Sequence, residues 1–222
     1  MRKFCFKDFV CTFDQNSKMV NQENIDKTQV ILGVAQRRFA QYGFLKTSMT
    51  EIASDAGMSK ASLYYYFEDK DAIFKEVIKN EQEGFISQIE KFIHSEPTAS
   101  KLLIIYVKKR LEYFELFLNL SKLNAESIKT VKPIFNELSG KFNEKEILLV
   151  SKIISAGVRN GEFEKANSKE LATLFVRLIQ SLRSNVILRS GIENINTIDF
   201  HQLMDNCINT AKIFGNGIKR KK

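Results

Sequence analysis

The chain contains no tryptophan, two histidines and three cysteines in 222 residues. The cysteines, Cys5, Cys11 and Cys207, are too few and too scattered to form a disulfide framework. His94 and His201 do not complete any residue spacing that is typical of a metal site. We therefore expect no bound metal and no cofactor, and a reducing, cytoplasmic environment.

Long apolar runs and common enzyme motifs are absent too. No stretch of about 18 uncharged apolar residues occurs, so we expect no membrane-spanning helix. The sequence lacks a glycine-rich phosphate loop, a nucleophile elbow and a paired-histidine metal motif, which argues against an enzyme. With two prolines, ten glycines and 44% hydrophobic residues, the composition favours a mostly helical globular protein. We predict an all-α fold.

A first short helix is indicated by local signals at both of its ends. Ser48 and Glu51 form the Ser-x-x-Glu pattern of a capping box, in which each side chain accepts a hydrogen bond from the other residue's backbone amide. We therefore expect a helix to begin at Met49. Gly57 provides the residue with positive φ that ends it.

A second short helix follows the glycine turn. Ser59 has the side chain needed to cap a helix that runs through residues 60–67. Ala53, Gly57 and Leu63 supply a small residue where the helices cross, the turn and an apolar anchor. This pattern predicts a helix-turn-helix, the unit that places its second helix in the major groove of DNA.

The same region, about residues 25–80, resembles the tetracycline-repressor (TetR) family of bacterial transcription regulators. The matching motifs are Ile31-Leu32, Ala35, Phe39, Gly43, Thr47-Ser48, Ile52-Ala53, Ala56-Gly57-Met58-Ser59, Leu63-Tyr64-Tyr65-Tyr66-Phe67 and Lys70. Tyr66 stands where the family often has histidine, and Ala61 where it often has glycine, which leaves the base preference open. The resemblance implies an N-terminal three-helix DNA-binding domain and a larger C-terminal helical domain for ligand binding and dimerisation.

The expected DNA contacts fall into two groups. Thr47 and Ser48 would hold one phosphate through hydroxyl and backbone N–H groups, and Lys70 would hold another on the opposite side. The second helix between them would read the bases. Its candidate contacts are Lys60, Ala61, Ser62 and Tyr64 toward base edges, with Tyr65 and Tyr66 toward the backbone or thymine methyl groups. Ser59, at the start of the same helix, is a further candidate contact. Some of these tyrosines are also expected to pack on the first helix of the domain.

Net charge contributes less to this prediction than geometry does. The chain carries a formal charge of +8, but residues 24–80 hold eight Lys and Arg against seven Asp and Glu, a net of +1. Four positive charges lie instead at residues 219–222, a run more typical of a solvated terminus than of a phosphate or membrane contact. Helix N-termini would therefore have to supply part of the grip on phosphate.

Four segments are expected along the chain: a flexible extension at 1–23, the helix-turn-helix domain at 24–70, a helical effector-binding and dimerisation domain at 71–216, and a basic tail at 217–222. The extension faintly resembles a signal peptide, although Lys7 and Asp8 interrupt its apolar residues. An arm into the minor groove is a second interpretation. The third, which we favour, is a disordered leader ahead of a true start at Met19.

Helical periodicity continues beyond residue 67 almost to the end of the chain. Asp69 and Asp71 complement the dipole at the start of a long helix that extends towards Pro97. Further helices are expected at 98–122, 125–138, 143–160, 168–189 and 197–214, with breaks near Gly43, Gly57, Phe67, Pro97 and Gly161. No strand pattern or internal repeat competes with this all-α interpretation.

An effector pocket is expected among the aromatic residues of the middle helices, which offer apolar surface and hydroxyl groups. The candidates are Tyr106, Tyr113, Phe114, Phe117 and Phe135. Ordinary core packing is the alternative for each of them. The adjacent Lys108-Lys109-Arg110 run would either attract an anionic effector or form a solvated helix face.

A dimer interface is expected on the last two helices, where apolar residues form stripes. The candidates are Phe175, Leu178, Leu182, Met204 and Phe214. The resemblance implies a four-helix bundle across a two-fold axis, and the alternative is that the stripes close the chain's own core. A homodimer also has a physical reason, because one short helix reads only about 3–4 base pairs, whereas a two-fold pair reads a palindromic operator in double-stranded DNA.

Three functions follow, in order of preference. The first is a sequence-specific transcription regulator, a repressor that a small-molecule effector releases from its operator. The second is a DNA-binding regulator whose C-terminal domain responds to a protein partner. The third is a helical enzyme or scaffold that retains a vestigial helix-turn-helix.

Overall fold

A computed structural model describes residues 22–96, 98–121, 125–190 and 199–221, with side chains described from residue 27 onward except at 117–121, 125–129 and 186–190. Within these ranges the chain forms eight α-helices and no strand. They are α1 (Gln22–Tyr42), α2 (Met49–Asp55), α3 (Lys60–Tyr66), α4 (Lys70–Ser95), α5 (Ala99–Ser121), α6 (Ala125–Arg159), α7 (Ser168–Ser190) and α8 (Phe200–Gly217). The predicted all-α fold is confirmed.

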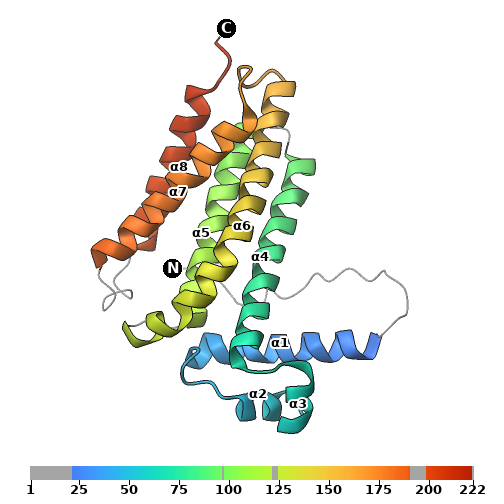
Figure 1. Ribbon diagram of the computed structural model, residues 1–222. Helices are drawn as coiled ribbons and strands as arrows, with labels where there is room; N and C mark the ends of the chain where they lie inside the picture. Colours follow the sequence, from blue (N-terminus) through green and yellow to red (C-terminus); the bar gives the residue numbers. More distant parts are fainter. Residues whose placement is uncertain (1–21, 97, 122–124, 191–198, 222) are drawn as a thin grey trace.

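The first three helices form a small unit, here called the head, at one end of the molecule (Figure 1). In this view α1 lies across the end of α4, with α2 and α3 below it. The rings of Phe39 and Phe44 pack on Phe74 of α4, with centroid distances of 5.1 and 4.8 Å. These aromatic contacts fix the head against the beginning of α4.

The local signals for the two short helices are confirmed. Ser48 caps α2 with the full capping box, and Ser59 caps α3 by accepting the backbone N–H of Ser62 at 3.0 Å. Gly57 has a φ of 66°, in the left-handed region that L-residues with a Cβ rarely adopt. Positive φ also occurs at two other predicted breaks, Gly43 and Gly161.

The core of the head extends into two helices of the C-terminal part. From α4 it takes Ile73, Phe74, Val77 and Ile78, and from α6 it takes Val131, Ile134 and Leu138. All seven side chains are buried. The head and the rest of the protein therefore share one continuous apolar contact.

Helices α4 to α8 form a bundle with its own core, in which α5 packs on α8 and α6 on α7 (Figure 1). Gly157 on α6 lies against Phe163 and Ala99; an added methyl group would come within 2.8 Å of the Ala99 Cβ and closer still to the Phe163 ring. This close approach requires glycine. No helix among the described residues is both long and apolar enough to cross a membrane.

Helix α6 corrects the predicted break between residues 138 and 143, because it continues without interruption from Ala125 to Arg159. Pro133 cannot donate to the carbonyl one turn earlier, and the helix changes direction in this half (Figure 1). Burial of Ile134 and Leu138 in the head's core holds the helical conformation despite that loss. Asn143 caps nothing; its Oδ1 accepts a hydrogen bond from Gln180 Nε2 at 2.7 Å.

The far end of the bundle is closed by Glu162 and the C-terminal segment. The carboxylate of Glu162 accepts the N–H groups of Ala99 and Ser100, at 2.7 and 3.0 Å, and so caps α5. The N–H of Arg220 donates to the Glu162 carbonyl oxygen at 3.0 Å. The backbone of the predicted basic tail is thus hydrogen-bonded at Arg220. The side chains at 219–221 are exposed, as expected.

The predicted break near Pro97 is confirmed, because α4 ends at Ser95 and α5 begins at Ala99. Two predictions fall on residues outside the described part of the chain, namely the nature of the extension at 1–21 and the side chain of Phe117.

Candidate nucleic-acid interface and effector cavity

The outer face of α3 is the exposed surface of the head on which most of the predicted DNA contacts lie. Leu63 is fully buried and anchors the helix on the head's core. On the opposite side Lys60, Ala61 and Ser62 are exposed, together with Tyr64 (47%) and Tyr65 (78%). This face therefore presents one ammonium, hydroxyl groups and two aromatic rings, the groups that can read base edges and thymine methyl groups.

Tyr66 is the tyrosine of this run that packs inward. Its side chain is half-buried against the head's core, and its ring lies 5.3 Å from that of Tyr65 in an edge-on arrangement. Some of the tyrosines were expected to pack on the first helix, and Tyr66 packs on the core to which that helix contributes. The prediction that Tyr66 contacts DNA is untested.

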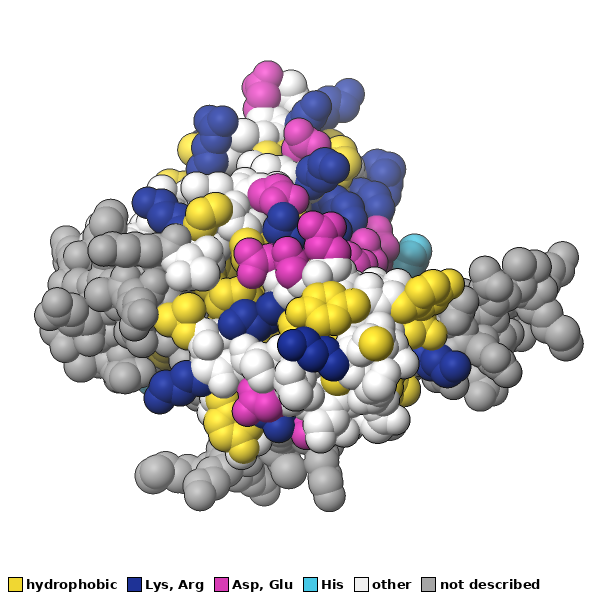
Figure 2. All heavy atoms as spheres, turned by 60° about the horizontal axis from the view of Figure 1, so that its bottom comes forward, with side chains coloured by type: hydrophobic (Ala, Val, Ile, Leu, Met, Phe, Trp, Pro, Cys, Tyr) yellow, Lys and Arg dark blue, Asp and Glu magenta, His cyan; other side chains and the backbone are white. Residues whose placement is uncertain are grey.

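Basic side chains are spread among neutral ones on this end of the molecule and do not gather into one patch (Figure 2). This distribution agrees with the net charge of +1 counted for residues 24–80. Any affinity for DNA must therefore depend on the shape and hydrogen-bonding groups of α3 more than on a broad positive field.

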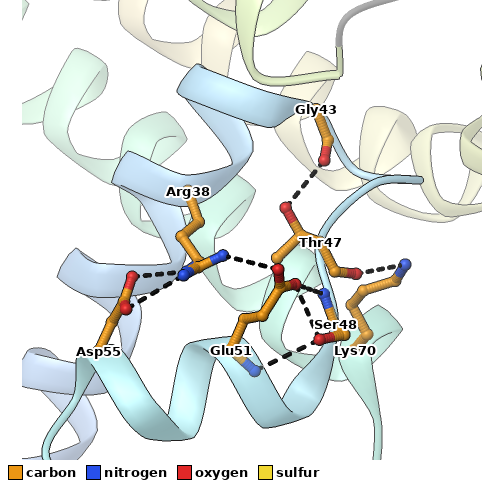
Figure 3. Close-up of polar contacts among 7 residues, drawn as sticks. All are labelled: Arg38, Gly43, Thr47, Ser48, Glu51, Asp55 and Lys70. Atoms are coloured by element: carbon orange, nitrogen blue, oxygen red, sulfur yellow. Dashed lines mark hydrogen bonds and ion pairs between the residues drawn. The ribbon is translucent and has the colours of Figure 1, made fainter.

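The phosphate contact at Thr47 and Ser48 stays a prediction, but the hydroxyl and N–H groups assigned to it already make hydrogen bonds within the head (Figure 3). Thr47 is 2% exposed, and its hydroxyl donates to the Gly43 carbonyl oxygen at 2.9 Å. The N–H and the hydroxyl of Ser48 both donate to the Glu51 carboxylate, each at 2.8 Å. These bonds lower the pKa of Glu51, so the carboxylate stays charged and repels a phosphate.

Lys70 also differs from its predicted role. Its Nζ donates to the carbonyl oxygens of Phe44 and Thr47, each at 2.9 Å, and is half-buried beneath them. Burial lowers the pKa of this ammonium. Two of its three protons are therefore committed inside the head, and the side chain fixes the turn before α2 instead of reaching outward as a free phosphate contact.

Arg38 on α1 is a residue that sequence reasoning missed. It forms an ion pair with Asp55, Nε to Oδ2 at 2.5 Å, and a second with Glu51 at 3.2 Å (Figure 3). The hydrogen bond from Arg38 lowers the pKa of Asp55. Glu51 and Asp55 are four residues apart and so lie on one face of α2, but no nearby sequence pattern indicates that Arg38 is their partner. This pair of contacts fixes α2 on α1.

A cavity of about 730 Å³ lies within the C-terminal bundle. Its walls come from four helices, α4, α5, α6 and α7. The predicted effector residues Tyr113, Phe114 and Phe135 line it. Its volume falls within the range of cavities that hold small molecules.

Tyr106 does not line this cavity, and its prediction as a direct contact is wrong for this site. Its ring is buried in the bundle core, 6.0 Å from that of Phe175. Its hydroxyl donates to Glu146 Oε1 at 2.8 Å, and burial beside this carboxylate raises the pKa of Tyr106. From the core, Tyr106 therefore holds Glu146, which lines the cavity.

Arg110 and Glu146 form a buried ion pair in the cavity wall. The Nε of Arg110 lies 2.5 Å from one Glu146 oxygen, and its Nη2 lies 3.3 Å from the other. The predicted basic run at 108–110 thus divides: Lys108 is exposed, whereas Arg110 is buried with a partner. A second buried guanidinium, Arg183 on α7, lines the same cavity, and sequence reasoning missed it because it lies within an otherwise ordinary amphipathic helix.

The residues predicted for a dimer interface divide between core and surface. Phe175 is fully buried in the chain's own core, 4.8 Å from the ring of Phe214, so its prediction as an interface residue is wrong. Phe214, Leu182 and Met204 are half-buried and pack on that core. Leu178 is exposed at 39%. Two further exposed apolar side chains on these helices are Leu174 and Ile213, which were not predicted.

Comparison with known proteins agrees with this geometry. The sequence family described as "Bacterial regulatory proteins, tetR family" matches residues 31–77, which cover most of the head and the first turns of α4. A crystal structure of a transcriptional regulator from Cytophaga hutchinsonii is 39% identical, with a TM-score of 0.80, over 87% of this chain and 99% of that one.

Two curated relatives are more distant. The fatty acid metabolism regulator protein of Bacillus subtilis is 26% identical over 66% of this chain and 75% of its own length. The HTH-type transcriptional repressor BepR of Brucella suis is 25% identical over 68% of this chain and 75% of its own length. All three relatives are named as regulators and not as enzymes.

Proposed function

Because the chain belongs to the TetR family of bacterial transcription regulators, and is not an enzyme, we propose that it is a cytoplasmic repressor. It binds a palindromic operator as a homodimer and leaves it when a small molecule enters the bundle cavity. The observation that carries this proposal is the exposed outer face of α3, held on a head in which the caps of α2 and α3 and the turn before α2 are hydrogen-bonded.

The proposed reading of DNA uses that face. Lys60 and Ser62 point donors and acceptors toward base edges, while Ala61 leaves room for close approach to the groove. Tyr64 and Tyr65 contact thymine methyl groups or the sugar-phosphate backbone. Ser59 remains at the N-terminus of α3 as its cap and lies beside the same surface.

The proposed homodimer uses α7 and α8. Leu174 and Leu178 lie one turn apart on α7 with their side chains exposed, and Ile213 on α8 is 73% exposed. Apolar side chains in this arrangement are suited to pack against the same helices of a second copy around a two-fold axis. Such a pair would place two α3 helices for two half-sites.

The proposed response to an effector uses residues that two regions share. Ile78 and Val131 belong to the core of the head, and both also line the cavity. A ligand that displaces either side chain therefore acts on α4 or α6 at the point where they hold the head. A change in the relative position of the two heads would then break the match to the operator.

A protein partner in place of a small molecule is the alternative effector. The cavity favours the small molecule, because its volume of about 730 Å³ and its walls from four helices suit a small ligand.

The experiment is selection from a pool of random duplexes with the purified full-length protein, followed by mobility-shift titration of the enriched sequence. We expect an inverted repeat whose halves are about one helical turn apart. Retention of duplexes without any enriched sequence would contradict the proposal. Metabolite extracts and protein fractions from the same cells, added to the bound complex, then distinguish the two kinds of effector.

A further inference from the structure

Arg183 is the charged side chain in the cavity wall whose environment is incomplete. It is 7% exposed, and its Nε is buried without a hydrogen-bond partner among the described residues. The guanidinium carbon lies 5.4 Å from the centroid of the Phe114 ring, so one face is covered by an aromatic group. Buried guanidinium groups are normally paired, because an unsatisfied charged donor is costly away from water.

Glu146, the carboxylate in the same cavity wall, already has hydrogen-bond partners. Glu146 accepts two hydrogen bonds from Arg110 and one from the Tyr106 hydroxyl. Arg110 and Arg183 also repel each other: burial, and then the charge of Arg110, lowers the pKa of Arg183 to about 10. Two buried guanidinium groups thus share one buried carboxylate, which leaves one positive charge in excess.

The remaining wall is suited to an apolar body. Aromatic and aliphatic side chains dominate one side of the cavity, namely Ile78, Tyr113, Phe114, Val131, Phe135 and Phe142. Amide and hydroxyl groups, such as those of Gln180 and Ser184, lie near Arg183 along α7. The cavity therefore has one buried cation, Arg183, whose Nε has no partner among the described residues, beside an extended apolar surface.

We propose that the cavity binds a carboxylic acid with an apolar body, and that Arg183 binds its carboxylate. This inference rests on the proposed function, since it names the chemical class of the effector at the same site. A single excess charge matches a monoanion, and the planar guanidinium matches a carboxylate better than an amine or an alcohol. The apolar body of the acid fills the aromatic side of the cavity.

The test measures binding to the full-length protein in the absence of DNA. The probes are decanoate and phenylpropionate, each compared with the alcohol and the amine of the same carbon skeleton, by titration calorimetry and thermal shift. For the wild-type protein we expect at least one acid to bind about tenfold or more tightly than its alcohol, and the amines to bind worst.

The matched variants are Arg183→Gln and Lys132→Gln. Lys132 also lines the cavity but is exposed, so its substitution should leave the preference for the acid in place. Arg183→Gln should bring acid and alcohol to within about twofold of each other. Because it removes a buried charge without a partner, it should also melt at or above the wild-type temperature, which shows that the fold is intact.

Three results would overturn the inference: no acid binds, the alcohols bind as tightly as the acids, or Arg183→Gln keeps the preference. Mobility shift of the operator complex is recorded separately. An acid that binds through Arg183 but does not release DNA contradicts the proposed response to an effector and leaves this inference standing. If only neutral molecules release the operator, the proposed response to an effector stands and the inference of a carboxylic acid is contradicted.

Discussion

The ammonium group of Lys70 lies directly beneath Phe44, with its Nζ 2.9 Å from the Phe44 carbonyl oxygen and 4.4 Å from the centroid of the ring. The same Nζ donates to the Thr47 carbonyl oxygen. The first residue of α4 is thereby bonded to the turn that leads into α2. Because of these bonds, a movement of α4 also moves the turn before α2. The contact therefore stabilises the head and couples it to α4.

Replacement of Lys70 by alanine should therefore lower the stability of the fold. Two buried carbonyl groups lose their donor, and we expect the free energy of unfolding to fall by about 1–3 kcal/mol. Urea denaturation followed by circular dichroism measures this. Lys79→Ala on the same helix, which removes only an exposed pair with Glu76, should change it by less than about 0.5 kcal/mol. Unchanged stability in Lys70→Ala would contradict the bracing role.

Replacement of Lys60 or Ser62 by alanine should weaken binding to the selected operator without affecting the fold. Both side chains are exposed, and loss of a base contact is expected to cost about 1–3 kcal/mol of specific binding. Mobility-shift titrations on operator and random duplexes separate this from general affinity. Lys101→Ala, at the far end of the bundle, serves as the matched loss of charge. Equal losses of affinity on both duplexes would indicate that Lys60 contacts the phosphate backbone and not the bases.

Replacement of Leu178 by glutamate should produce a folded monomer. The side chain is exposed in the single chain, so its charge becomes costly, by several kcal/mol, only where a second copy covers it. Sedimentation velocity should show a monomer where the wild type is a dimer, and tight operator binding should be lost. Phe175→Glu, at a core position, should instead unfold the chain. A Leu178→Glu dimer would exclude this part of α7 from the interface.

The pH dependence of stability should carry a contribution from Glu81. Burial raises its pKa to about 7, although the hydrogen bond from Gln36 of α1 opposes this. Because the folded-state pKa is raised, the contribution is complete below about pH 4.5 and is lost as the pH rises through 7. At 1.36 kcal/mol for each pKa unit, the loss is at most about 3 kcal/mol.

Glu81→Gln measures that contribution directly. The variant should be more stable than the wild type at pH 8, and the difference should shrink towards pH 5, where Glu81 is mostly protonated in the folded chain. Denaturant titrations over this range are sufficient. A difference that is constant with pH would show that Glu81 keeps its ordinary pKa.

Two glycine substitutions with opposite expected signs test the packing of α6. Gly157→Ala forces a methyl group against Phe163 and Ala99, and overpacking of this kind is expected to cost about 1–3 kcal/mol. Gly84→Ala on α4 meets no atom within 4 Å and should stabilise its helix by about 0.5–1 kcal/mol. Chemical denaturation of the two variants side by side is the measurement. A neutral Gly157→Ala would mean that the contact relaxes freely.

The sequence predicted what is decided within one or two turns of chain. The caps at Ser48 and Ser59 and the positive φ at Gly57 involve neighbours three to five residues apart, so α2 and α3 were predicted almost to the residue. The partners of Lys70 and Arg38 depend on tertiary packing, and no local pattern names them. In the structure the Lys70 ammonium, predicted to contact phosphate, donates to two carbonyl groups within the head.

The same division applies to the C-terminal part. Periodicity identified apolar faces but could not say which of them turn inward, so Phe175 was assigned to a partner and lies in the core. Local signals at Asn143 predicted the start of a helix, but packing on both sides kept α6 continuous. No sequence pattern indicated a role for Arg183, because the role of a buried arginine depends on the residues that surround it in the folded chain.

The contribution of α6 to the head has a consequence for the construction of chimeras. A fragment that ends after α4 would leave the surface normally covered by Val131, Ile134 and Leu138 open to water, so we expect it to be less stable than the same helices in the whole chain. An exchange of operator specificity between relatives should therefore be limited to the exposed residues of α3. Grafting of a whole head would require this patch of α6 to be transplanted with it.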